Sequence, residues 1–212
     1  MIGLFRSVAI VSLCFAASAN ATPISVSASE AGQTTSTVAG VTTVDFNAGN
    51  CAGYASCTGD FALVSGSASG LYAQPFGTNS TFISVPNLSD TTHTAVLNLG
   101  LQANYFGLFW GSIDSYNIIS FFSGDTQIGS FSGADLPSLS ASGNQSEWSS
   151  NRYINFDFGP ASFDSVKLIS SGFAFESDNH AYRSASVPEP MNMMLMALGL
   201  FGLVIARRFN RG

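Results

Sequence analysis

Aromatic and polar side chains gather in the middle of the chain in a pattern typical of saccharide binding. An aromatic ring stacks on the apolar face of a sugar, while carboxylate and amide groups bond the sugar hydroxyls. The candidate ligand-binding residues are Trp110, Asp114, Tyr116, Asn117 and Trp148. The alternative for Trp110 is a core position at the end of a hairpin, with Asp114 as a turn residue. Trp148 follows a polar loop, so we expect it to be the more exposed tryptophan.

Oxygen-bearing side chains in the last third of the chain are candidates for a Ca²⁺ site. The set is Asp157, Glu176, Asp178 and Asn179. Ca²⁺ binds hard oxygen donors that lie close together in a loop. No spacing of the EF-hand type is present, and Asp and Asn are also common turn residues. Calcium is therefore one of two interpretations of this set, and no other cofactor is predicted.

Catalytic motifs are absent from the sequence. His93 and His180 are the only histidines, and neither stands in a triad or metal-binding motif. Gly111-Ser112 lacks the second glycine of a nucleophile elbow. We therefore expect a protein that is not an enzyme. The alternative is a secreted carbohydrate-active enzyme, because its paired carboxylates come from distant strands and leave no local pattern.

The C-terminal segment combines three parts in a fixed order. A Val187-Pro188-Glu189-Pro190 motif precedes an apolar run over 191–206, and the chain then carries Arg207, Arg208 and Arg211. The prolines prevent a helix through the motif and leave it extended. A helix over the apolar run would rise about 24 Å, short of the roughly 30 Å hydrocarbon core, so spanning requires local thinning of the bilayer. The arginines would stay in the cytoplasm.

This arrangement resembles the PEP-CTERM sorting signal of exosortase substrates. The resemblance implies that exosortase, a membrane-embedded Cys protease or transpeptidase, recognises the Pro-Glu-Pro motif. It also implies that the C-terminal transmembrane helix holds the chain in the inner membrane until processing. The destination would be the cell surface or the extracellular polysaccharide of a bacterial biofilm. The alternative is an ordinary tail anchor that happens to contain Pro-Glu-Pro.

The N-terminal segment has the pattern of a cleavable signal peptide. Arg6 precedes an apolar run over 7–17, and Ala19 and Ala21 occupy the −3 and −1 positions of a predicted cut after Ala21. Small side chains are needed there because the peptidase holds the chain in two shallow pockets. The alternatives are an uncleaved membrane anchor and a lipoprotein cut before Cys14.

The three predicted regions are a signal peptide over 1–21, an extracellular β domain over 22–186 and the sorting signal over 187–212. The body holds twelve of the thirteen acidic residues but three of the seven basic ones, which leaves a net charge of −9. Nucleic acid and anionic lipid are therefore poor partners for it. A polysaccharide remains a compatible partner.

Cys51 and Cys57 are the cysteines of the body and are separated by a short glycine-containing segment. Two cysteines in an oxidising compartment most often pair, so a structural disulfide is expected. A redox or metal-binding pair is the alternative, although no second cysteine pair or nearby histidine supports it.

Alternation of apolar with polar residues predicts an all-β body. In 152–158, Tyr153, Asn155 and Asp157 fall on one face of a strand, and Ile154 and Phe156 on the other. Around nine or ten short strands predict an antiparallel β-sandwich or jelly roll. The clearest predicted strands are 41–46, 81–85, 93–99, 105–110, 116–122, 127–131, 152–158, 165–169 and 172–176.

Two patches of the body also resemble a family of exosortase-dependent surface proteins. They are the segment 109–117, which reads Phe-Trp-Gly-Ser-Ile-Asp-Ser-Tyr-Asn, and the segment 174–179, which reads Ala-Phe-Glu-Ser-Asp-Asn. This resemblance implies a secreted β domain and does not imply a biochemical activity.

Overall fold

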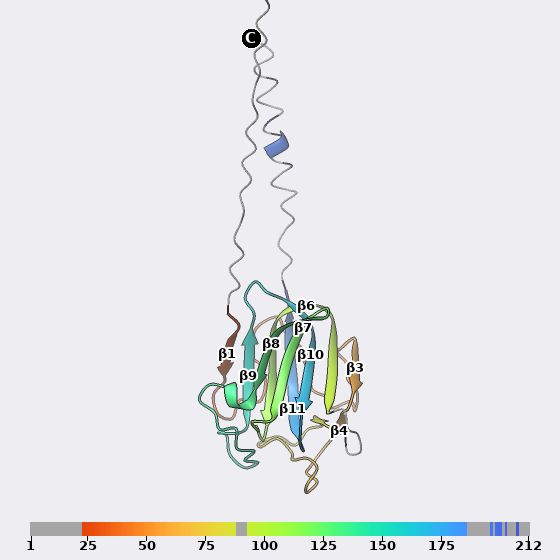
Figure 1. The fold of residues 1–212 in the computed structure, drawn as a ribbon, viewed down its shortest axis with the longest axis vertical. Helices are drawn as coiled ribbons and strands as arrows, with labels where there is room; N and C mark the ends of the chain where they lie inside the picture. Colours follow the sequence, from red (N-terminus) through yellow and green to blue (C-terminus); the bar gives the residue numbers. More distant parts are fainter. Residues whose placement is uncertain are drawn as a thin grey trace, which may run out of the picture.

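Antiparallel strands make up nearly all of the regular structure in the body, which confirms the expected all-β class (Figure 1). The structure is a computed structural model that describes residues 23–87, 93–185, 196, 198–200, 202 and 207. The strands are β1 (Ser25–Ala28), β2 (Thr42–Val44), β3 (Ser56–Gly59), β4 (Ala62–Val64), β5 (Phe82–Val85), β6 (Thr94–Gly111), β7 (Asn117–Ser123), β8 (Thr126–Ser132), β9 (Arg152–Asp157), β10 (Phe163–Ser170) and β11 (Phe175–Ser184). One short 3-10 helix, Gly133–Asp135, follows β8.

The strands form one continuous 11-stranded sheet rather than two separate sheets. Its central path runs β4-β5-β11-β6-β10-β7-β8, while β9 pairs with β6 and with β1. The first half-sheet contains β3, the start of β6, β10, β7 and β8. The second half-sheet contains β1, β9, the end of β6, β11, β2, β5 and β4. The two half-sheets are therefore joined through β6.

The 18-residue strand β6 replaces two strands that the sequence predicts separately, over 93–99 and 105–110. Gly100 lies between them with a positive φ of 71°, which is a conformation that glycine adopts readily. The register with β10 also shifts here, between the pairs Ser165–Asn98 and Phe163–Ala103. The chain thus passes from one half-sheet to the other within a single strand, and Gly100 marks an irregular position in that strand.

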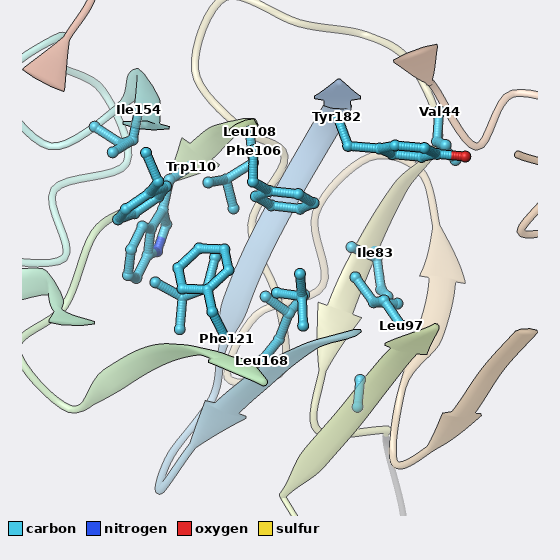
Figure 2. Close-up of a cluster of buried hydrophobic side chains, with 14 of the residues drawn as sticks. Val44, Ile83, Leu97, Phe106, Leu108, Trp110, Phe121, Ile154, Leu168 and Tyr182 are labelled. Atoms are coloured by element: carbon cyan, nitrogen blue, oxygen red, sulfur yellow. The ribbon is translucent and has the colours of Figure 1, made fainter. Parts of the chain in front are cut away.

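Aromatic rings fill the space between the half-sheets. Phe121 of β7 contacts Phe106 of β6 at 5.8 Å between ring centroids and Phe156 of β9 at 5.0 Å. Figure 2 shows Phe106 and Phe121 together with the fully buried Trp110. Because β7 belongs to the first half-sheet and β9 to the second, these contacts hold the two halves face to face around one core.

The outer face of the second half-sheet is also covered. Tyr105 and Tyr153 point away from the core, yet each is at most 1% exposed. The Tyr105 hydroxyl lies 2.8 Å from the Ser36 hydroxyl and donates to Asn155 at 2.7 Å. Gly107 makes room for both rings, because a Cβ there would lie within 2.7 Å of each tyrosine. The segment around Ser36 therefore adds a layer outside the sheet.

The last strand is longer than the sequence predicts. β11 occupies Phe175–Ser184, whereas the pattern indicates a short strand over 172–176. Asp178 and Asn179 suggest a turn by composition. In the structure they form a bulge, since the register with β6 shifts between Asp178 and Ala181 and Asn179 has a φ of 48°. A bulge of this kind keeps the strand running while it redirects side chains.

The predicted disulfide between Cys51 and Cys57 is present. Two further contacts attach the loop that it closes to β11. The Tyr54 hydroxyl lies 2.7 Å from Nδ1 of His180, and the Tyr182 hydroxyl donates to the Gly53 carbonyl oxygen. The loop is thus held both covalently and through the core.

The chain enters β1 and leaves β11 at the same end of the sheet. Ser25 pairs with Asp157, Asp157 with Tyr105, and Tyr105 with Arg183, so β1 begins at the end where β11 finishes, with β9 and β6 between them (Figure 1). The opposite end is marked by the pairs Trp110–Arg152 and Glu176–Gly111. In the part of the chain that the structure describes, no helix has the length and apolar character needed to cross a membrane.

Candidate ligand-binding site

A pocket of about 460 Å³ opens at the end of the molecule where β11 begins. Three distant parts of the chain line it, namely the 67–72 loop, the 144–150 loop and the segment that leads into β11. The side chains that give it chemical character are Ser67, Ser69, Tyr72, Gln145, Phe173 and Glu176. The pocket therefore combines two aromatic rings, three uncharged polar groups and one carboxyl group.

Glu176 lies at the inner wall of this pocket and is 2% exposed. Its carboxylate accepts hydrogen bonds from the Ala73 amide at 2.8 Å and from the Ser112 hydroxyl at 2.6 Å. Burial raises the pKa of Glu176 to about 7, although both donors act in the opposite direction. The carboxyl group can therefore gain or lose its proton near neutral pH.

Phe173 forms part of the rim and is 44% exposed, an unusual position for a phenylalanine in this chain. The segment that carries it is held by two residues at the junction between β6 and β7. The Tyr116 hydroxyl donates to the Phe173 carbonyl oxygen at 2.9 Å, and Asn117 Nδ2 donates to the Ala174 carbonyl oxygen at 3.0 Å. Tyr116 and Asn117, both predicted to bind ligand, therefore position the pocket rim in this structure.

Asp114 stands in the connection between β6 and β7, half-buried, beside Tyr116. Burial raises the pKa of Asp114, and the Tyr116 hydroxyl partly opposes this shift. The negative charge of Asp114 also contributes to the raised pKa of Glu176. Asp114 thus adds to the negative potential around the pocket without forming part of its described lining.

Trp110 is a core residue, which confirms the core interpretation of its ring over the ligand-facing one. It is fully buried and stacks on Phe175, with the ring centroids 4.2 Å apart and the planes 14° from parallel. A sugar ring cannot reach either face of the indole in this arrangement. The alternation of β6 explains the result, because Phe106, Leu108 and Trp110 all point to the core (Figure 2).

Trp148 is partly exposed but packs outside the pocket lining. Its ring contacts Phe76 at 5.0 Å and Phe109 at 6.2 Å between centroids, and it lies directly over Gly77. Trp148 therefore covers the outer face of the second half-sheet, next to the loop that carries Gln145.

Sequence patterns missed four residues that shape the pocket. Tyr72, Gln145 and Phe173 line it, while the buried Asn151 holds the surrounding loops together. Oδ1 of Asn151 accepts from the amides of Phe76 and Ser112, and its Nδ2 donates to the carbonyl oxygens of two residues in the 144–147 loop. The one sequence signal for the pocket was Tyr72, an aromatic residue within a Ser/Gly-rich stretch, and such a pattern is weak.

The predicted calcium ligands do not form one cluster. Asp157 lies at the far end of β9 and pairs with Arg183 at 3.8 Å, whereas Glu176 lies in the pocket. Asp178 accepts from Ser80 at 2.5 Å, and the Asn179 side chain donates to the Thr34 carbonyl oxygen. Among the described residues, no group of three His, Cys, Asp or Glu side chains is placed to hold a metal ion.

His180 is buried in the core between two hydroxyl groups. Its Nε2 lies 2.8 Å from Oγ of Ser177, and Nδ1 lies 2.7 Å from the Tyr54 hydroxyl. Burial lowers the pKa of His180 to about 3, so the ring is neutral at physiological pH. Ser177 and His180 are both 0% exposed, which leaves no access for a substrate to this pair in the structure.

Most residues of the predicted sorting and processing sites lie outside the described residues. These are Ala19, Ala21, Val187, Pro188, Glu189, Pro190, Arg208 and Arg211. Arg207 is described, and it is helical and exposed.

Comparison with known proteins bears on the C-terminal segment alone. Neither the curated proteins nor the solved structures include a significant match to this chain. The family described as the PEP-CTERM protein-sorting motif matches residues 186–208. This match includes Pro188, Glu189, Pro190 and the first arginines of the cluster, and it confirms the resemblance drawn from them. The chain is therefore a protein with a PEP-CTERM sorting motif at its C-terminal end.

Proposed function

We propose that this chain is an exported surface protein that exosortase processes, and that its non-catalytic β domain binds extracellular polysaccharide through the Glu176 pocket. The PEP-CTERM motif is the single observation that carries the first part, because such motifs direct exported proteins to exosortase. The pocket supports the second part, because its two rings and uncharged polar groups suit a sugar unit.

The placement of the pocket relative to the sorting motif supports this function. The motif begins at residue 186, one residue beyond the last described residue that follows β11. Glu176 lies near the start of the same strand, and an extended strand of this length separates it from Ser184, at the end of β11, by roughly 25 Å. A body attached through its C-terminal end would thus present the pocket away from the attachment point.

The route to the surface follows from the ends of the chain. In this proposal, signal peptidase cuts after Ala21, and the segment after Pro190 holds the chain in the inner membrane until exosortase acts at the Pro-Glu-Pro motif. The body then remains at the cell surface or in the extracellular matrix. The net charge of −9 on the body fits a partner that is not itself anionic.

Replacing Glu189 tests the sorting step. Glu189→Ala should leave the chain unprocessed in the membrane fraction, whereas the control Glu30→Ala, an exposed site in the body, should be processed normally. Immunoblots of membrane, surface and medium fractions measure the distribution. Normal surface delivery of Glu189→Ala would count against exosortase processing.

Replacing a rim residue tests the binding step. Phe173→Ala should weaken retention of the full-length chain on purified extracellular polysaccharide about fivefold, since one stacking ring contributes on the order of 1 kcal/mol. Trp148→Ala is the control, because that ring lies outside the described pocket lining. Equal retention of the wild type and Phe173→Ala would contradict the proposed site.

A carbohydrate-active enzyme is the second candidate, because Glu176 combines a pocket position with a pKa of about 7 and lies in the field of a second carboxylate, Asp114. Assays for reducing ends, run on the same polymer in parallel, separate the two candidates. Product formation that Glu176→Gln abolishes would replace the binding function with hydrolysis.

A further inference from the structure

Glu176 is a buried carboxyl group whose described partners are neutral. It accepts from one backbone amide and one hydroxyl, and the nearby charge that acts on it, that of Asp114, has the same sign. Removing a carboxylate from water is costly unless a positive group or several donors compensate. Among the described residues, Glu176 therefore has no cation beside it when its carboxyl group is ionised.

The basic residues of the described body are all engaged elsewhere. Arg152 donates to the carbonyl oxygens of Trp148 and Ser29, and Arg183 pairs with Asp157. Lys167 lies over the ring of Phe122 at 4.1 Å. None of the three belongs to the described lining of the pocket. The described residues thus leave room for a ligand to supply a positive charge to Glu176.

The remaining lining suits a small cation carried on a sugar ring. Tyr72 and Phe173 present aromatic rings, whose faces attract ammonium groups as well as the apolar face of a sugar. Ser67, Ser69 and Gln145 supply hydroxyl and amide groups for the sugar hydroxyls. The volume of about 460 Å³ lies within the range of small-ligand pockets.

We infer that the pocket selects an amino sugar with a free ammonium group, which binds the Glu176 carboxylate while the sugar ring rests against Tyr72 and Phe173. This inference rests on the proposed polysaccharide-binding function and specifies the class of polymer, namely one that carries unacetylated amino sugars. Acetylation removes the positive charge and adds bulk, so the acetylated form of the same sugar should bind more weakly.

Chitosan and chitin oligomers of equal length provide the test, because they differ in the acetyl group alone. The full-length chain is purified in a detergent without a sugar headgroup, and binding is measured by isothermal titration calorimetry at neutral pH. Wild type should bind the chitosan oligomer at least about tenfold more tightly, as expected for one charge-assisted hydrogen bond. Glu176→Gln should lose this preference, because it removes the negative charge. The amide oxygen of the new side chain can still accept from the Ala73 amide, so the pocket should stay folded.

Two further variants separate recognition by Glu176 from folding and from general electrostatic attraction. Gln145→Lys alters an exposed side chain and brings a positive charge to the pocket, so it should weaken chitosan binding more than chitin binding. Glu30→Gln makes the same charge change as Glu176→Gln at an exposed site outside the lining, and it should keep the wild-type preference.

The outcomes distinguish this inference from the function on which it rests. Equal affinity of the wild type for the two oligomers would overturn the ammonium inference and leave saccharide binding in place. A preference that survives in Glu176→Gln would overturn the role of Glu176. Binding of neither oligomer, while purified extracellular polysaccharide is still retained, would overturn the amino-sugar class alone. Failure with all three ligands would overturn both proposals.

Discussion

Two aromatic residues near the pocket end differ in what surrounds them. Trp110 lies between core side chains and stacks on Phe175, whereas the ring of Phe173, two residues earlier in the chain than Phe175, stands at the rim. Burial determines the contribution of each ring to stability, and exposure determines which ring is accessible to a ligand.

Truncating the two rings should therefore lower the free energy of unfolding by different amounts. Trp110→Ala should lower the free energy of unfolding by about 3–5 kcal/mol, because it leaves a large cavity in the core. Phe173→Ala should lower it by less than about 1 kcal/mol. Urea denaturation of the two variants measures both values. A small effect of Trp110→Ala would contradict its core placement.

The raised pKa of Glu176 predicts a pH dependence of stability. The folded chain holds this proton more tightly than the unfolded chain, whose pKa stays near 4.5. The stabilisation is therefore fully present below pH 4.5 and is lost as the pH rises through about 7. The loss should amount to roughly 2–3 kcal/mol in the free energy of unfolding.

Glu176→Gln isolates this contribution. The pKa of Asp178 is raised to about 6, so its contribution to the free energy of unfolding is also lost as the pH rises. The contribution of the neutral His180 is lost as the pH falls below 6.5. Both remain in the variant, so they cancel when wild type and Glu176→Gln are compared between pH 4 and 8 by denaturation. Parallel curves for the two proteins would show that Glu176 does not titrate as described.

At the scale of elements, the Cys51–Cys57 loop is held in two independent ways, and one of them connects it to β11. One is the disulfide that closes the loop next to β3. The other is the pair of contacts from Tyr54 to His180 and from Tyr182 to the Gly53 carbonyl oxygen. The loop should therefore keep its position when the disulfide is removed, although the unfolded chain gains freedom.

Removal of the disulfide should cost about 2–3 kcal/mol of the free energy of unfolding, as expected for closing a short loop. The double variant Cys51→Ser/Cys57→Ser should unfold at a lower urea concentration than the wild type but stay folded in buffer. Added reductant serves as the control, because it should shift the wild type toward the variant and leave the variant unchanged. No shift of the wild type would indicate that the bond contributes little.

At the scale of the whole molecule, the pocket lies at the start of β11, and the sorting motif follows the end of that strand in the sequence. The pairing across β1, β9, β6 and β11 places Ser25 in line with Arg183, and the pocket opens at the other end of the same strands. If the body is tethered at its C-terminal end, the pocket therefore lies at the end of the sheet that points away from the tether.

Surface labelling tests this orientation. Gln145→Cys, an exposed residue at the pocket, should react quickly with a bulky membrane-impermeant maleimide on intact cells. Ser184→Cys, also exposed but at the tethered end of β11, should react more slowly. Mass-tag shifts on immunoblots report both rates. Labelling of Gln145→Cys that requires cell lysis would contradict surface display.

Local features of the chain were predictable from sequence alone. The Pro-Glu-Pro motif and the arginines that follow it lie in one short segment of the chain, and the disulfide joins cysteines six positions apart. The alternation in 152–158 places Ile154 and Phe156 in the core as predicted, because side-chain direction in a strand depends on the adjacent backbone. Near neighbours in sequence carry each of these properties, so the pattern was sufficient.

The pocket and the burial of Trp110 required the tertiary structure. Tyr72, Gln145 and Glu176 are far apart in the chain and meet because the loops at one end of the sheet converge around Asn151. Whether Trp110 faces solvent depends on Phe175, which arrives from β11. Strand pairing over long sequence separations decides such contacts, and the order of residues along one strand does not contain that information. The sequence by itself thus determined the sorting motif of this protein, and the fold decided which residues form its candidate binding site.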